Sequence, residues 1–356
     1  MWSIELLHRR RPESNSRRSA ARNDSRQTVT QYVGSDGQRP GIRTLAGLHW
    51  GISGPVDALV GICKSIWTLY LFTASDFNAV LYPQTLFAVL SMVSGKFTSP
   101  SWEAEPQLQF CARLLRVVLW IWLQLLVLDV ANQRLPGSIA EDRINKPWRP
   151  ITSGRISPDG ARALLLVSIA VTLGTSVWLG VTYEALVLFM LNWMYNDLGL
   201  ANDHWLLRNL MNALGITAIG AGATRVACGH DLAILFGSAT RWWLMCAGVL
   251  LTTIHAQDLY DQEGDAARGR STAPISLGDG VARWSIGVGV LFWSIAMPTS
   301  LGLRVQQDWL GYMGPGLLGI VLTARVLTLR NVAADKRTFK LWVLWTMSLY
   351  SLPLAA

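Results

Sequence analysis

The chain has little charge for its length. Only 15% of its 356 residues are charged and 51% are hydrophobic, whereas about a quarter of the residues in a soluble domain are charged. It also has only five histidines and four cysteines. The cysteines have no CxxC spacing, so neither a disulfide framework nor a zinc site is indicated. We therefore expect a membrane protein whose cysteines act as small apolar residues in helices.

The basic residues do not have the arrangement of a nucleic-acid-binding surface. The formal net charge is +8, but the arginines and lysines lie in the N-terminal tail and in connections between apolar segments. In such places they set the orientation of membrane spans and contact anionic lipid headgroups. We therefore expect the lipid bilayer, and no nucleic acid, as a partner. The sequence indicates no protein partner.

Residues 1–50 contain no sustained apolar run and are rich in arginine, serine, asparagine and glycine. This composition predicts a disordered basic tail in the cytosol. A mitochondrial transit peptide is the alternative, because such peptides are rich in arginine and serine. They avoid acids, however, and the tail contains Glu5, Glu13, Asp24 and Asp36. We therefore favour the endoplasmic reticulum over the mitochondrial inner membrane.

Residues 57–76 are apolar but contain Lys64 and begin and end with an acid. This pattern favours a helix that lies at the membrane interface over a full span. The remainder, residues 77–356, predicts an all-α, polytopic helical bundle that forms the catalytic domain. Nine segments of about 16–22 residues are each near bilayer thickness. They are 77–95, 113–131, 160–181, 184–199, 206–224, 241–259, 282–303, 309–329 and 340–355.

The two most polar connections follow the second and the sixth of these segments. With the tail in the cytosol, the positive-inside rule places both connections on the cytosolic side, because the connections on that side hold most of the loop arginines and lysines. This assignment requires that residues 57–76 do not cross the membrane. The equivalent positions of the two connections suggest two four-helix halves with a site at their interface.

The connection from Gln257 to Ile275, QDLYDQEGDAARGRSTAPI, carries three aspartates at spacings i, i+3 and i+7. Asp258, Asp261 and Asp265 would then share one face of a helix that continues out of the sixth segment, and Glu263 would point elsewhere. Three carboxylates on one face repel one another unless a cation lies between them. Oxygen ligands without histidine or cysteine clusters select Mg²⁺. The alternative for any single aspartate is a solvated helix end.

The earlier connection, from Asn132 to Ile151, is NQRLPGSIAEDRINKPWRPI. Glu141 and Asp142 are its only acids, and Asn132 adds a neutral oxygen at the end of the second segment. The same connection supplies positive charge that can bind a diphosphate directly. These basic residues are Arg143, Lys146 and Arg149. A loop that served only to set topology would not need this alternation of carboxylates and arginines.

The two connections resemble the two aspartate-rich motifs of the UbiA superfamily of intramembrane prenyltransferases. Asp142 to Ile151 with Asn132 upstream resembles the first motif, and the DxxDxxxD run from Asp258 to Asp265, followed by Arg268 to Thr272, resembles the second. The likeness covers about residues 65–350. It implies nine transmembrane helices around a central cavity, in which Mg²⁺ bridges both motifs to a prenyl diphosphate.

The resemblance also implies roles for single residues. It implies catalytic roles for Asp142, Asp258, Asp261 and Asp265, and metal-binding roles for these four together with Asn132 and Glu141. It implies diphosphate-binding roles for Arg143, Lys146, Arg149, Arg208, Asn209 and Arg268. For Arg208 and Asn209, an interfacial anchor and a helix cap are the alternatives. His255 could orient an aspartate, but we expect it to be hydrogen-bonded between helices.

The first motif departs from the family pattern. Gln133 replaces the first aspartate, the middle aspartate is missing, and the interval from Asn132 to Asp142 is about two residues longer. This form resembles a fungal branch that includes membrane-bound sesquiterpene cyclases. We therefore expect a cyclase that ionises a prenyl diphosphate, with farnesyl diphosphate as the preferred substrate. The alternative is a prenyltransferase that acts on an aromatic or quinone-precursor acceptor.

Overall fold

The computed structural model describes residues 55–98, 107–229 and 236–356. Within these ranges the regular structure is helical, with no β-strand, so the prediction of an all-α fold is confirmed. Residues 59–356 form one compact unit. The predicted disordered tail of residues 1–50 lies outside the described residues.

The first half of the bundle consists of helices on both sides of the earlier polar connection. They are α1 (Pro55–Thr73), the π-helical turn η1 (Phe77–Leu81), α2 (Tyr82–Val93), α3 (Gln107–Gln133), α4 (Pro136–Asn145), α5 (Pro158–Trp178) and α6 (Thr182–Asn196). Short sequence signals set their ends. Ser157 accepts a hydrogen bond from the Gly160 amide at 3.0 Å and so caps α5, in which Pro158 takes the first helical position.

The second half contains the later polar connection. Its helices are α7 (Leu200–Asp203), α8 (Trp205–Cys228), α9 (Phe236–Thr253), the 3₁₀ turn η3 (Ile254–Gln257), α10 (Gln262–Arg268), α11 (Ala273–Leu277), α12 (Asp279–Ser300), α13 (Trp309–Thr328), α14 (Val332–Tyr350) and the 3₁₀ turn η4 (Leu352–Leu354). Asn331 caps α14 by accepting from the Ala334 amide at 2.9 Å.

Each of the nine predicted spans coincides with a helix of the described chain. Four helices there are long and apolar enough to cross a membrane: α3, α5, α12 and α13. The pair formed by Asp57–Thr73 and Phe77–Val93 also passes this test, but it is bent by 63°. Length and composition therefore support four crossings in the described chain, or five if the bent pair forms one span, and the count of nine stays a prediction.

Apolar side chains cover the outside of the bundle as well as its core. Leu166 and Val167 on α5, and Phe292 and Ile295 on α12, are about 60% exposed. Large exposed apolar surfaces of this kind are typical of contact with lipid. Inside, buried tryptophans bond to hydroxyl groups on neighbouring helices, as in the bond from Trp120 to Ser176 at 3.0 Å.

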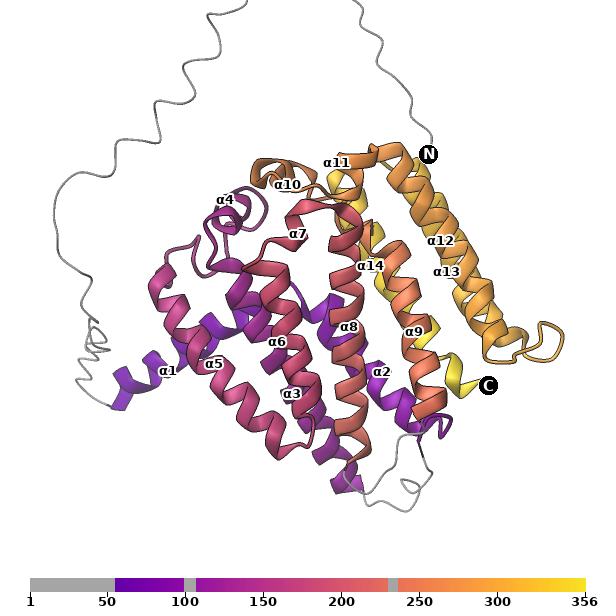
Figure 1. Ribbon diagram of the computed structural model, residues 1–356, viewed down its shortest axis with the longest axis horizontal. Helices are drawn as coiled ribbons and strands as arrows, with labels where there is room; N and C mark the ends of the chain where they lie inside the picture. Colours follow the sequence, from indigo (N-terminus) through magenta and orange to yellow (C-terminus); the bar gives the residue numbers. More distant parts are fainter. Residues whose placement is uncertain (1–54, 99–106, 230–235) are drawn as a thin grey trace, which may run out of the picture. The chain divides into compact units, whose positions relative to one another are not determined.

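The short helices α4, α7, α10 and α11 lie together at one end of the bundle (Figure 1). Of these, α4 and α10 pack directly against each other. The contact depends on glycine, because a methyl group on Gly264 of α10 would overlap the side-chain amide of Asn145 on α4. The packing of α4 against α10 brings the two polar connections, which are far apart in sequence, into one place.

Candidate active site

A cavity of about 910 Å³ lies between α3, α6, α8 and α14. Small-molecule sites typically have volumes of roughly 300–1,000 Å³. The long helices line it with apolar side chains, including Leu125, Phe189, Ile216 and Met347. The two polar connections line it with Glu141, Lys146, Arg149, Asp261 and Arg270. The predicted central cavity is therefore present, and residues of both motifs line it.

The first motif begins where α3 ends. Asn132 lines the cavity, and its side-chain amide donates to the Asn196 oxygen of α6 at 2.7 Å. Gln133 points the other way and donates to the Phe72 carbonyl of α1 at 2.8 Å. The chain then turns, and Pro136 opens α4 at a position where its missing N–H costs nothing. The end of α3 is thus bonded to α1 and α6.

Asp142 and Arg149 form a buried ion pair within the first motif. Nη1 of Arg149 donates to both carboxylate oxygens of Asp142, at 2.9 and 3.1 Å, and Nη2 donates to the Ser75 hydroxyl at 3.3 Å. Burial raises the pKa of the Asp142 carboxyl group, and Arg149 offsets this rise only in part. The Nε of Arg149 is buried and has no acceptor among the described residues, so this guanidinium still has a donor to offer.

The aspartates of the second motif do not lie on one continuous helix, which corrects the prediction from their spacing. Helix α9 ends at Thr253, the 3₁₀ turn η3 follows, and α10 begins only at Gln262. The chain breaks between Asp258 and Asp261, so their positions depend on tertiary packing and not on helical periodicity. Glu263 is exposed.

Asp258 is almost fully buried, at 1% exposure, and is bonded to Arg208 of α8. Nη2 and Nε of Arg208 lie 3.0 and 3.3 Å from one carboxylate oxygen of Asp258, and Nη1 donates to the Tyr195 hydroxyl at 2.8 Å. Arg208 also lines the cavity. The structure thus brings the predicted diphosphate-binding arginine into contact with a predicted metal ligand.

Two arginines, one at the end of α10 and one just after it, connect the motifs to each other. Nη1 of Arg270 lies 3.0 Å from Glu141 of α4 and 3.0 Å from Asp265 of α10. Arg268 donates to the other oxygen of Glu141 at 3.0 Å. Burial raises the pKa of Glu141, but Arg270 and Arg268 outweigh it, so the pKa ends below its usual value. Glu141 is therefore held ionised between two guanidinium groups.

The second-motif carboxylates are, in contrast, poorly compensated. Burial raises the pKa of Asp261 to about 6; Lys146 opposes this rise, and Asp265, Glu141 and Asp258 add to it. Burial also raises the pKa of Asp265, and the Asp258 carboxylate raises it further. Arg208 and Arg270 lower this pKa, but not enough to offset the two effects. Carboxyl groups that raise one another's pKa in this way are a common setting for a cation.

The donors around the cavity fit a hard divalent cation only if other ligands complete its shell. One oxygen each of Asp258 and Asp265 is buried with no hydrogen-bond partner among the described residues. In the part of the chain that the structure describes, no three histidine, cysteine, aspartate or glutamate side chains lie close enough together to hold a metal ion by themselves. Mg²⁺ usually binds through one or two carboxylates and takes water and phosphate oxygens as its remaining ligands. The donor set fits that mode of binding.

Three of the predicted diphosphate ligands do not line the cavity. Arg143 is exposed, Arg268 is engaged with Glu141, and Asn209 faces away. The Asn209 amide lies 3.1 Å from Nδ1 of His255, whose Nε2 is 2.9 Å from the Ser285 hydroxyl. The expectation that His255 is hydrogen-bonded between helices is therefore confirmed.

Five charged residues that line the cavity were not predicted as site residues. They are Asp76, Asp129, Arg270, Lys336 and Lys340. Asp129 could have been noticed, because an acid inside an apolar span is a common sign of function. Lys336 and Lys340 share one face of α14, but only the tertiary structure places that face beside the motifs.

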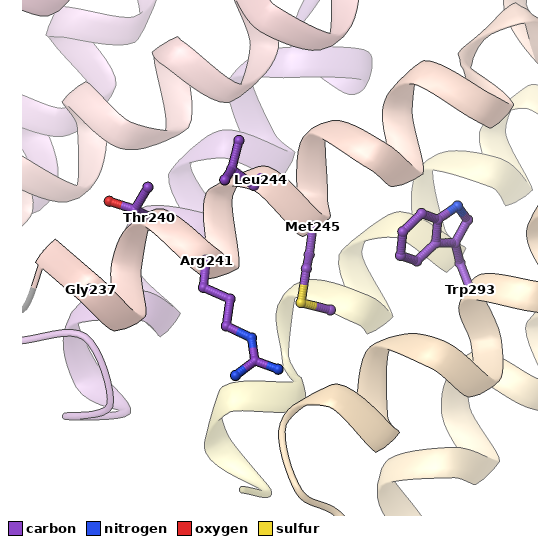
Figure 2. A pocket seen from close by; sticks show the side chains of 6 residues that line it. All are labelled: Gly237, Thr240, Arg241, Leu244, Met245 and Trp293. Carbon is purple, nitrogen blue, oxygen red and sulfur yellow. The ribbon is translucent and has the colours of Figure 1, made fainter.

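A second hollow, of about 690 Å³, lies on the outside of the bundle between α9 and α12. Figure 2 shows Thr240, Arg241, Leu244 and Met245 projecting from α9 and Trp293 from α12. It is largely open, and no carboxylate lines it. It therefore does not have the ligands that a metal-bound diphosphate needs.

Comparison with known proteins identifies the family. Residues 81–345 match the UbiA prenyltransferase family. A somaliensene A/B synthase from Streptomyces somaliensis is 30% identical over 299 residues, covering 83% of this chain and 93% of that protein. A fumagillin beta-trans-bergamotene synthase from Aspergillus fumigatus is 35% identical over 217 residues, covering 61% and 68%. A polyprenyl transferase from Hericium erinaceus is 29% identical over 226 residues, covering 63% and 73%.

Solved structures share the fold. A digeranylgeranylglyceryl phosphate synthase superposes with a TM-score of 0.54 at 17% identity, covering 81% of this chain and 97% of that one. A UbiA homolog from Archaeoglobus fulgidus bound to GPP and Mg²⁺ has a TM-score of 0.51 at 14% identity, covering 79% and 99%. With the family match spanning both motifs and the whole cavity-forming bundle, the chain belongs to the UbiA prenyltransferase family.

Proposed function

We propose that this protein is a membrane-bound, Mg²⁺-dependent terpene cyclase that ionises farnesyl diphosphate and closes it to a sesquiterpene. The observation that carries the proposal is a set of buried polar atoms without partners in the two motifs, beside the cavity that Arg149 and Asp261 line. Oxygens of Asp258 and Asp265 lack donors, and nitrogens of Arg149 and Asn145 lack acceptors, among the described residues. A metal-bound diphosphate would satisfy both kinds of group at once.

The ionisation step depends on how the charge of the leaving group is stabilised. Arg149, Arg208 and Lys146 line the cavity, and Lys146 forms no ion pair with any described residue. These cations would stabilise the negative charge that accumulates on the diphosphate as its bond to carbon breaks. A bound Mg²⁺, held by carboxylates of both motifs, would add Lewis-acid stabilisation of the same charge.

The cavity wall beyond the motifs would hold the prenyl chain and the allylic cation. Its apolar side chains exclude water, which would otherwise capture the cation. Phe189 and Tyr195 present aromatic rings that can stabilise a cation. The relatives named as somaliensene and bergamotene synthases support cyclisation. The polyprenyl transferase relative supports the second candidate, transfer of the prenyl group to an aromatic acceptor.

The orientation in the membrane is part of the proposal. We infer that the site opens to the cytosolic side of the endoplasmic reticulum, because α4 and α10 carry the polar connections and lie at one end of the bundle (Figure 1). The basic residues of these connections favour the cytosolic side. Nine crossings, arranged as two four-helix halves and a final helix, would place both motifs on that side.

The proposal is tested by product analysis without an acceptor. The purified protein in detergent, given farnesyl diphosphate and Mg²⁺ alone, should release diphosphate and a volatile hydrocarbon, and Asp258→Asn should lower both by orders of magnitude. Geranylgeranyl diphosphate, run in parallel, measures the preference for chain length. If turnover occurs only after an aromatic acceptor is added, the protein is a prenyltransferase and the cyclase proposal is wrong.

A further inference from the structure

A glycine in the middle of α8 lines the cavity, although no neighbouring side chain requires a glycine there. Gly215 lies near the centre of α8. Glycine inside a helix is less favourable than alanine, because it loses more conformational freedom on folding. A side-chain carbon built at Gly215 would meet no atom of the described residues within 4 Å. Packing within the protein therefore does not explain why this position has no side chain.

Two other glycines of α8 show the contrast. A methyl group on Gly220 would overlap side chains of α2, and one on Gly222 would overlap Trp120 of α3. Small residues at such positions let neighbouring helices approach closely. Helix packing thus accounts for Gly220 and Gly222, but not for Gly215.

Gly215 lies in the middle of the face of α8 that lines the cavity. The other residues of this face recur at helical spacing before and after Gly215. They are Arg208, Met211, Asn212, Ile216 and Ile219. Gly215 itself is half-buried. A side chain at this position would therefore project into the cavity.

The level of Gly215 in the cavity corresponds to the hydrocarbon part of the substrate. Arg208, which is bonded to Asp258 at 3.0 Å, marks the end at which the diphosphate would bind. Gly215 follows seven residues later on α8, which is about two turns or about 10 Å along the axis. Leu125 and Leu188 line the cavity at a similar distance from the ends of α3 and α6, and both helices pack against α8. Gly215 therefore lies at the level of apolar wall residues and away from the bond that breaks.

We propose that the space beside Gly215 receives the prenyl chain where it folds back, and that the missing side chain sets the chain length that the cavity accepts. This inference rests on the proposed function, because it requires a prenyl diphosphate bound at the motifs. A side chain at this position would fill the space, so a long chain would no longer fold there and a shorter chain would be preferred. Gly215 is thus a specificity-determining residue that takes no part in ionisation.

The test is Gly215→Ala, which adds one methyl group and replaces glycine with a better helix former. Diphosphate release from geranyl and farnesyl diphosphate is measured at saturating Mg²⁺, and kcat/KM is compared. One methylene group in an apolar pocket typically changes discrimination by roughly 10–200-fold. We expect the ratio of kcat/KM for geranyl to that for farnesyl diphosphate to rise at least about tenfold. The apparent Tm should be unchanged or higher, and Gly215→Leu should raise the substrate ratio further.

A matched control separates the cavity from a general effect of removing a helix glycine. Gly174 lies inside α5, is exposed, does not line the cavity, and would also meet no described atom within 4 Å. Gly174→Ala should leave the substrate ratio unchanged. The ratio of the hydrocarbon products from farnesyl diphosphate, measured by gas chromatography, should change in Gly215→Ala and stay constant in Gly174→Ala, because only residue 215 alters the space in which the chain folds.

The inference is overturned if the substrate ratio is unchanged in both Gly215→Ala and Gly215→Leu, or if it changes equally in Gly174→Ala. A lower Tm in Gly215→Ala would also overturn it, because the glycine would then be needed for packing. Failure of the cyclase proposal is visible separately, since the native protein would form no hydrocarbon. The inference is then decided by thermal stabilisation with the unreactive geranyl and farnesyl thiodiphosphates: it stands if Gly215→Ala weakens binding of the farnesyl compound selectively, and it fails if both bind as they do to the native protein.

Discussion

The contact between the two motifs can be tested by replacing one arginine. In Arg270→Gln, Glu141 keeps Arg268 at 3.0 Å, but Asp265 loses the one cation among the described residues that is hydrogen-bonded to it. The more distant charge of Arg208 then compensates this buried carboxylate alone, and breaking a buried ion pair costs about 3–5 kcal/mol. At about 2 °C per kcal/mol for a large domain, the apparent Tm in detergent should fall by roughly 6–10 °C.

Activity should fall as well, because Arg270 lines the cavity and holds α4 to α10. Removing one well-placed donor to a developing negative charge costs roughly 10²–10³-fold in kcat. The assay is release of inorganic diphosphate from farnesyl diphosphate at saturating Mg²⁺. The matched control is Arg268→Gln, which removes a cation that contacts Glu141 alone and does not line the cavity.

The stability loss should also depend on pH in one direction. Burial already raises the pKa of Asp265, and the loss of Arg270 should raise it further. A carboxyl group whose pKa is raised by folding destabilises the folded state when it is ionised, and this penalty disappears as the pH falls through the folded pKa. The difference in Tm between Arg270→Gln and the native protein should therefore narrow from pH 8 to about pH 5.

Equal effects of Arg270→Gln and Arg268→Gln would refute this reasoning, because Asp265 would then not need its own cation. A double variant gives a second test. Combining Arg270→Gln with Asp265→Asn removes both charges and should restore part of the lost stability, since no buried ion is left without a partner. A double variant as unstable as the sum of the two single variants would show that the pair does not interact.

Three further predictions concern packing, a distant ion pair and the metal. Gly264→Ala should lower the free energy of unfolding by about 1–3 kcal/mol, because its methyl group would overlap Asn145. In the same thermal assay, Gly280→Ala should be neutral or stabilising, because its methyl group would meet no neighbour. Arg283→Gln leaves buried Asp335 without its partner at 2.8 Å, so it should destabilise by about 3–5 kcal/mol without altering the product ratio measured by gas chromatography. Chelation with EDTA should abolish diphosphate release, and added Mg²⁺ should restore it; full activity in EDTA would exclude a divalent cation.

Local patterns in the sequence were sufficient to predict where the helices lie. Long apolar runs predicted nine segments, and each coincides with a helix, because a chain in lipid must satisfy its backbone hydrogen bonds within the segment. The alternation of carboxylates and arginines predicted both motifs from their chemistry. Within the first motif, Pro136 to Asn145 form the separate helix α4.

The same patterns failed where packing overrides periodicity. The spacing of Asp258, Asp261 and Asp265 fits a helix, but the chain forms a 3₁₀ turn and then breaks before α10. Thr253, at the end of α9, bonds to the indole of Trp342 on α14 at 3.0 Å. Helical periodicity alone does not indicate such contacts. The prediction of a continuous helix was therefore wrong, although all three aspartates lie near the candidate site.

The sequence by itself thus determined that the chain is an all-helical membrane protein with two motifs that combine carboxylates and arginines, because composition and local spacing carry that information. Only the tertiary structure decided which charged side chains form ion pairs with each other. Arg208 pairs with Asp258, 50 residues away, and Arg270 with Glu141, 129 residues away. Such pairs depend on helix packing, in which long-range contacts and close approach at glycine select the partners.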